Sequence, residues 1–116
     1  MKKRTINIQG KDINLCYCAA VESGFEQIRG KSVFEFDWKR HEDLLAMVVA
    51  SIVAAATAEG KEPVLSSNDI LYNTSPKDIA TLIEAVVALR NEWYEVPATA
   101  PKPEKTEEEA DGSKNA

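Results

Sequence analysis

Residues 44–58, LLAMVVASIVAAATA, say most about the fold, because they carry no charged side chain and offer apolar surface around almost all of a helix. A helix that is apolar nearly all round lies at the centre of a domain or is covered by another chain. The stretch is shorter than the roughly 20 residues of a membrane span, so it predicts a buried central helix. Gly60 ends this helix, and Glu42 and Asp43 lie in its first turn, where the helix dipole favours carboxylates.

This helix has more apolar circumference than a small domain easily buries. The face that carries Val48, Ile52 and Ala55 is therefore the predicted route to self-association or client binding. A charge placed on this face is expected either to unfold the domain or to abolish oligomers.

The sequence before this helix predicts a β-hairpin and a shorter helix. Residues 5–17, TINIQGKDINLCY, alternate apolar and polar side chains on both sides of a Gly-Lys-Asp turn. That period of two indicates a hairpin with one apolar face. Residues 18–30 then place apolar side chains at helical spacing and end in Gly30, a typical C-cap, although Gly24 in the middle weakens the pattern.

Two segments are harder to assign. Residues 31–40, KSVFEFDWKR, alternate aromatic and acidic side chains from Phe34 to Trp38, which fits either a third strand or an extended connection. The phrase NDILY predicts one helical turn, with Ser67 or Asn68 as its cap.

The last predicted helix has the clearest start. Ser75 is its N-cap, Pro76 occupies its first position and Asp78 is the acidic third residue. Apolar side chains then follow at intervals of three and four until Pro97 ends the helix.

Trp93 and Tyr94 close this helix, and their large area suits either a lid on the core or an anchor for a partner. The apolar stripe favours the core for Trp93, whereas Tyr94 points away from the stripe. Both are predicted partner-binding residues, together with the face of the central helix described above.

These patterns predict an α+β fold that is mainly α, with an N-terminal β-hairpin followed by about three helices. Residues 1–96 form one small domain. Residues 97–116, PATAPKPEKTEEEADGSKNA, have three prolines, five carboxylates and no large apolar side chain, so they predict a disordered acidic tail that serves as a tether or linker.

The charge pattern argues against several partners. The net charge is −5, and the only basic run, Lys2-Lys3-Arg4, is interpreted as a solvated terminus, so nucleic acid is not a predicted partner. The residues after this run alternate and supply no apolar signal-peptide region. The predicted location is the cytoplasm, with no membrane partner.

No catalytic, metal or cofactor site is predicted. Cys16 and Cys18 are interpreted as reduced thiols, with at least one of them buried. A zinc site needs about four ligands, and the two cysteines with the single histidine, His41, supply only three. His41 itself is interpreted as part of a solvated helix start. The protein is therefore predicted not to be an enzyme.

The order of the predicted parts resembles the tail assembly chaperones of long-tailed phages and prophages. The quoted parts are the opening INIQGKDINLCY, the short helix AVESGFEQIRG, the central helix LLAMVVASIVAAATAEG and the capped helix SPKDIATLIEAVVALRNEW, followed by the acidic tail. The resemblance is one of layout over nearly the whole chain. The aromatic segment 31–40 departs from what the family has at that place.

This resemblance implies a non-enzymatic protein of the bacterial cytoplasm that is absent from the finished virion. It would coat the tape measure protein, keep it soluble and help to recruit tail tube subunits. The family also makes a longer product by programmed frameshifting, and Ser113-Lys114-Asn115 can be encoded by a slippery A-AAA-AAC run. The gene sequence tests this hypothesis.

Two other classes of function stay open. The first is a small self-associating adaptor, in which the apolar face of the central helix makes a homo-oligomer. The second is an enzyme subunit that completes its site with residues of another chain. Gene neighbourhood separates the three, since a tape measure gene immediately downstream favours the chaperone.

Overall fold

The computed structural model describes residues 1–95 and confirms a mainly helical α+β fold that opens with a β-hairpin. Three long α-helices follow the hairpin, as predicted, and the turn predicted around NDILY forms a fourth, short helix within the described residues. The elements are β1 (Lys2–Ile8), β2 (Lys11–Tyr17), α1 (Ala19–Arg29), the 3-10 helix η1 (Val33–Glu35), α2 (His41–Ala58), α3 (Ser67–Tyr72) and α4 (Pro76–Tyr94). The predicted tail, 97–116, and the slippage site at 113–115 lie outside the described residues.

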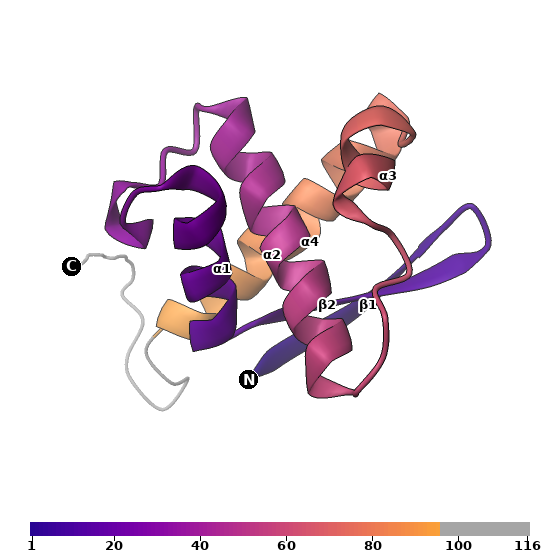
Figure 1. Ribbon diagram of the computed structural model, residues 1–116, viewed down its shortest axis with the longest axis horizontal. Helices are drawn as coiled ribbons and strands as arrows, with labels where there is room; N and C mark the ends of the chain where they lie inside the picture. The colour runs from indigo at the N-terminus through magenta and orange to yellow at the C-terminus, as the bar shows by residue number, and fades with distance from the viewer. Residues whose placement is uncertain (96–116) are drawn as a thin grey trace.

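The central helix α2 organises the molecule. Figure 1 shows α2 in the middle, with α1 on one side, α3 on the other and α4 crossing it. Helix α2 packs against α1, β2 and α4, and α4 also covers the hairpin. One continuous apolar core therefore draws side chains from the hairpin and all four helices.

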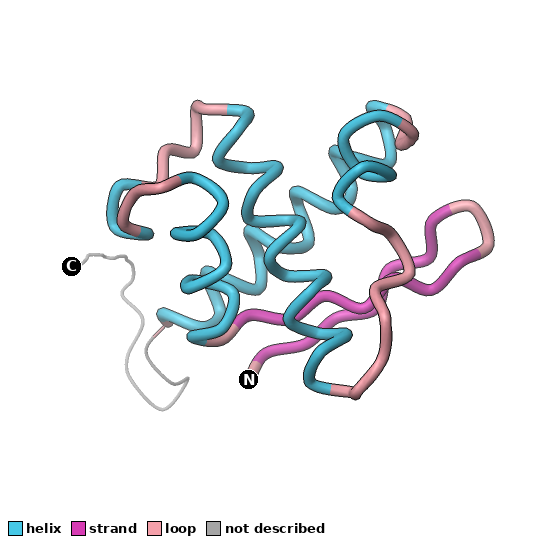
Figure 2. The backbone as a smooth tube through the Cα atoms, in the orientation of Figure 1, coloured by secondary structure: helices cyan, strands magenta, loops and turns pink. Residues whose placement is uncertain are grey.

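The hairpin turn lies one residue earlier than predicted. Ile8 pairs with Lys11, so Gln9 and Gly10 alone form the turn, and both have positive φ, 54° and 78°. Two positive φ values define a type I′ turn, whose twist matches that of the two strands, and glycine adopts such values without strain. Lys11 and Asp12, which the sequence assigned to the turn, belong to β2 (Figure 2).

Gly24, which weakened the prediction of α1, has a packing role. A Cβ atom at this position would lie 3.2 Å from the Cβ of Ala50 on α2, closer than most Cβ contacts. The two small residues let α1 and α2 approach each other closely, which compensates for the low helix propensity of glycine. Gly30 caps the same helix in the left-handed conformation, as predicted.

The helix caps follow the sequence signals, with one shift. Ser75 caps α4 by accepting a hydrogen bond from the Asp78 backbone N–H, as predicted. In α3 the cap is Ser66, one residue before the predicted candidates, and it forms a reciprocal capping box with Asp69.

A buried serine joins α2 to the hairpin. The Ser51 hydroxyl accepts a hydrogen bond from the Cys16 backbone N–H at 3.0 Å and donates one to the Cys16 carbonyl at 2.7 Å. Both residues are fully buried. One side chain thus satisfies both backbone groups of a residue that water does not reach.

Replacing Ser51 with alanine is expected to lower the free energy of unfolding by about 1–3 kcal/mol, because it leaves the buried Cys16 N–H and carbonyl without partners. Urea denaturation followed by circular dichroism measures the change. Thr57→Ala, at an exposed position of the same helix, is the control and should stay within about 0.5 kcal/mol of wild type. An equally small effect of Ser51→Ala would show that other groups satisfy Cys16.

Candidate interaction surfaces

The predicted partner-binding face of α2 is not available. Val48, Ile52 and Ala55 are 0%, 2% and 4% exposed and belong to the core of the single chain. The prediction of a free face is wrong, because α1, β2 and α4 together cover more of α2 than its apolar circumference suggested. The exposed large apolar residue of this helix is Val53, at 44%.

By length and composition alone, α2 is the one helix within residues 1–95 that could cross a membrane. A buried core helix passes the same test, and 44% of these residues are buried inside the fold. This signal is therefore weak, and packing accounts for the apolar character of α2.

The two aromatic residues predicted at the end of α4 do reach the surface. Trp93 is 39% exposed and Tyr94 is 50% exposed. Their rings pack against the buried ring of Tyr17, with centroids at 6.1 Å and 6.3 Å. Each ring therefore covers the core with one part and presents another part to solvent, and the role of partner anchor stays a prediction.

The Arg90 side chain contacts three aromatic rings near the end of α4. Its guanidinium carbon lies 5.2 Å from the ring centroid of Phe36, 5.3 Å from that of Trp38 and 5.2 Å from that of Tyr94. We call Phe36, Trp38, Arg90 and Tyr94 the Arg90 cluster. Trp38 is 45% exposed, and the buried Nε of Arg90 has no hydrogen-bond partner among the described residues. Cation–π attraction holds the guanidinium within the cluster.

The carboxylate of Glu22 holds Tyr94, one of the residues of the Arg90 cluster, in place. One oxygen of Glu22 accepts hydrogen bonds from the hydroxyls of Tyr17, at 2.9 Å, and of Tyr94. Burial and the hydrogen bond to Glu22 raise the pKa of both tyrosines, so both hydroxyls remain donors at neutral pH. The end of α4 is thereby fastened to β2 and α1.

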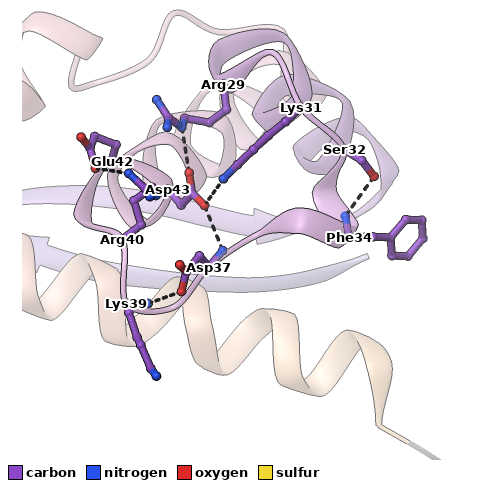
Figure 3. Close-up of polar contacts among 9 residues, drawn as sticks. All are labelled: Arg29, Lys31, Ser32, Phe34, Asp37, Lys39, Arg40, Glu42 and Asp43. Carbon is purple, nitrogen blue, oxygen red and sulfur yellow. Dashed lines mark hydrogen bonds and ion pairs between the residues drawn. The ribbon is translucent and has the colours of Figure 1, made fainter.

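The connection between α1 and α2 is neither a strand nor wholly extended. It contains η1, and the following loop is held by Asp43, a carboxylate with 0% exposure (Figure 3). Asp43 accepts from Arg29 Nε at 2.7 Å, from Lys31 Nζ at 2.8 Å and from the Asp37 backbone N–H at 2.9 Å. The sequence had assigned Asp43 only to the helix dipole.

The Asp43 contacts also determine its charge. Burial by itself raises the pKa of a carboxyl group, but the hydrogen bonds from Lys31, the Asp37 backbone and Arg29 outweigh burial and lower the pKa of Asp43 below its usual 3.8. Asp43 is therefore ionised at neutral pH and connects three segments through charge-assisted bonds.

A groove that the sequence did not predict lies between the start of α2, α3 and the first half of α4. Its volume is about 340 Å³. The lining is aliphatic apart from two polar residues, and consists of His41, Leu45, Ile70, Leu71, Thr74, Pro76, Ile79, Ala80 and Ile83. Leu71 on its rim is 50% exposed.

His41 and Cys16 lie in different environments of the described structure. Within residues 1–95 no group of three His, Cys, Asp or Glu side chains could hold a metal ion. His41 is exposed at the start of α2. Cys16 is buried, and burial raises the pKa of its thiol to about 12, so it is a poor nucleophile at neutral pH.

No protein-family model, curated protein or solved structure matches this chain. The distinctive features of the described surface are the Arg90 cluster and the groove.

Proposed function

We propose that this protein is a tail assembly chaperone of a long-tailed phage or prophage, with no enzymatic activity. It binds the tape measure protein in the bacterial cytoplasm, keeps it soluble and helps to recruit tail tube subunits, and it is absent from the finished virion. The observation that carries the proposal is the Arg90 cluster with Trp93 beside it. The resemblance in the order of elements supplies the identity of the client.

The composition of this surface suits a protein client. Trp, Tyr and Arg are the residues that most often dominate the binding energy of protein interfaces. Here Trp38, Trp93 and Tyr94 expose between 39% and 50% of their surface, and Arg90 lies among the rings. Glu22 holds the Tyr94 hydroxyl, Asp43 holds the backbone next to Trp38, and Trp93 packs on Tyr17, so little conformational entropy is lost when a partner binds these side chains.

The same surface suits a helical client in particular. A long helical protein with repeated apolar faces aggregates unless another apolar surface covers those faces. The rings of the cluster offer such a surface, and the Arg90 guanidinium offers a partner to a carboxylate that borders an apolar stripe. Recognition of this kind requires repeated apolar helical faces rather than one defined peptide sequence. A protein that coats a long client along its length needs the same kind of recognition.

Co-expression with the tape measure protein tests the proposal. Wild-type chain should keep the tape measure protein in the soluble fraction and co-purify with it. The double variant Trp38→Ala/Trp93→Ala should fold, as judged by circular dichroism, but leave most of the client insoluble. Tyr72→Ala removes an aromatic residue that is 79% exposed outside the cluster and is the matched control, with full activity expected.

Two results would contradict the proposal. If the folded double variant protects the client as well as wild type does, the Arg90 cluster is not the binding surface. If wild-type chain neither solubilises nor co-purifies with the tape measure protein, the chaperone function itself is wrong, and the self-associating adaptor becomes the better hypothesis.

A further inference from the structure

Arg90 differs from the other arginines of the described residues. Within residues 1–95, Arg4, Arg29 and Arg40 each lie within 4.0 Å of a carboxylate oxygen. Arg90 has no carboxylate at that distance in the same part of the chain, and the three rings of its cluster surround the guanidinium instead. A positive charge in such a partly apolar setting, without a counter-ion, attracts a carboxylate more strongly than a fully solvated charge does.

The guanidinium of Arg90 is buried at one end and accessible at the other. Its Nε is buried and has no hydrogen-bond partner. The two terminal nitrogens also donate no hydrogen bond within residues 1–95, but they are not among the buried atoms, and the residue as a whole is partly exposed. A partner that binds the terminal nitrogens therefore meets a planar donor group from which the fold has already removed part of the water, which lowers the cost of forming an ion pair.

The carboxylates that neighbour the cluster are engaged by other groups. Glu92 lies two residues after Arg90 in α4, but it pairs with Arg4 at 2.6 Å. One oxygen of Glu22 accepts from the hydroxyl of Tyr94, and Glu22 lies more than 4.0 Å from the guanidinium. These carboxylates weaken the positive field around the cluster at longer range. Any preference for an acidic partner must therefore come from direct contact with the Arg90 nitrogens.

The rings around Arg90 define the rest of the partner. Trp38 is 45% exposed and Tyr94 is 50% exposed, so a partner that reaches the guanidinium also covers aromatic surface. An amphipathic helix supplies both contacts, because a residue on the border of its apolar stripe lies three or four positions from residues within the stripe. A Glu or Asp at the border can reach Arg90 while the stripe packs on the rings, whereas a Lys or Arg there meets a like charge.

We propose that Arg90 determines which helices the cluster accepts, by pairing with a Glu or Asp side chain on the border of the client's apolar stripe. This inference rests on the proposed function, because it takes a helical client bound on the Arg90 cluster as given. It adds the specificity of that site: helices with acidic borders are selected, and helices with basic borders are rejected by repulsion and by the loss of the pair.

Three synthetic peptides serve as probes, each titrated into the full-length protein. Each has about 20 residues, which is long enough for a stable helix. The peptides share one leucine stripe, contain no tryptophan and differ only in the residues that border the stripe, which are Glu, Gln or Lys. The intrinsic fluorescence of Trp38 and Trp93 reports binding, since both side chains are partly exposed at the site.

Wild type should bind the Glu peptide at least about tenfold more tightly than the Gln peptide, which is the effect of one hydrogen bond between charged groups. The Lys peptide should bind most weakly. The net charge of −5 would produce the opposite order, because a negatively charged protein attracts basic peptides at long range. The expected order therefore reports contact with the guanidinium.

Variants of Arg90 assign the preference to this side chain. Arg90→Gln should bind the Glu and Gln peptides equally, and Arg90→Lys should keep part of the preference, because an ammonium group retains the charge but lacks the planar fork. Lys61→Gln removes a positive charge that is 72% exposed beyond the other end of α2, and as the matched control it should keep the wild-type preference. Circular dichroism checks that the variants fold, and a merely structural defect would weaken all three peptides alike.

Three results would overturn the inference and leave the proposed function standing. They are equal affinity of wild type for the Glu and Gln peptides, a wild-type preference for the Lys peptide, and an Arg90→Gln variant that keeps the tenfold preference. In each case the cluster would still bind helices through its rings. If wild type binds none of the peptides, the inference is also wrong, and co-expression with the tape measure protein then decides the proposed function separately.

Discussion

Replacing Asp43 with asparagine is expected to lower the free energy of unfolding by about 3 kcal/mol, because removing one partner of a buried ion pair leaves the remaining groups uncompensated. The variant loses the charge that holds Arg29 and Lys31. The loss falls at the low end of the usual range, since these two side chains are 28% and 25% exposed and can recover part of their hydration. Urea denaturation at neutral pH measures the difference.

The effect of this substitution should depend on pH. Because the pKa of Asp43 is lowered in the folded state, its carboxylate stabilises the fold above the unfolded value of 3.8. This stability is lost as pH falls through the lower folded pKa. The difference between wild type and Asp43→Asn should therefore be complete above about pH 5 and shrink as the solution becomes more acidic.

A neighbouring carboxylate provides the control. Glu42 is exposed and lies 4.0 Å from Arg40, so Glu42→Gln should change stability by less than about 0.5 kcal/mol. If Asp43→Asn were as mild as Glu42→Gln at neutral pH, the connection between α1 and α2 would not depend on Asp43.

Replacing Ile52 with glutamate is expected to unfold the protein. The side chain is 2% exposed in the central helix, and the change exchanges a buried aliphatic group for a charge with no partner. The combined cost of lost burial and buried charge is about 5 kcal/mol or more, which is comparable to the whole stability of a small domain. Thermal denaturation followed by circular dichroism should show no cooperative transition.

Val53, which directly follows Ile52, provides the control for this substitution. Val53 is 44% exposed on the same helix, so Val53→Glu should retain a cooperative transition close to that of wild type. A folded Ile52→Glu variant with an unchanged thermal midpoint would place this face of α2 outside the core, as the sequence had suggested.

Elements whose signals are local could be predicted from the sequence. The hairpin follows from a period of two around glycine, and α4 follows from Ser75 at the N-cap, Pro76 at the first helical position and Asp78 at the third. Even the errors are small here, since the turn and the α3 cap moved by about one residue.

Features that depend on contacts distant in sequence could not be predicted. The alternating aromatic residues of 31–40 fit a strand, but within residues 1–95 no third strand pairs with them, and Phe36 packs on Phe25 and Arg90 instead. The burial of Asp43 likewise requires Arg29 and Lys31 to fold back over the start of α2.

The same distinction between local signals and distant contacts applies to the candidate interaction surfaces. Trp93 and Tyr94 reach solvent because they end a helix, which the sequence shows directly. The burial of Val48, Ile52 and Ala55 depends on how many elements cover α2. The sequence of a helix that is apolar all round does not indicate how many elements pack on it. The groove is made by three elements together, so no single segment of the sequence indicated it.

The two bonds between Ser51 and Cys16 also affect how this protein behaves when many copies are crowded together. A two-stranded sheet leaves one open side on each strand, and open sides invite pairing with strands of other chains. The bonds of Ser51 occupy the outward backbone groups of β2 at Cys16. On β1 the exposed Lys2 and Lys3 place positive charges where another strand would have to align. Another strand would therefore meet occupied backbone groups at Cys16 and positive charges at Lys2 and Lys3, which disfavours edge-to-edge pairing at these positions.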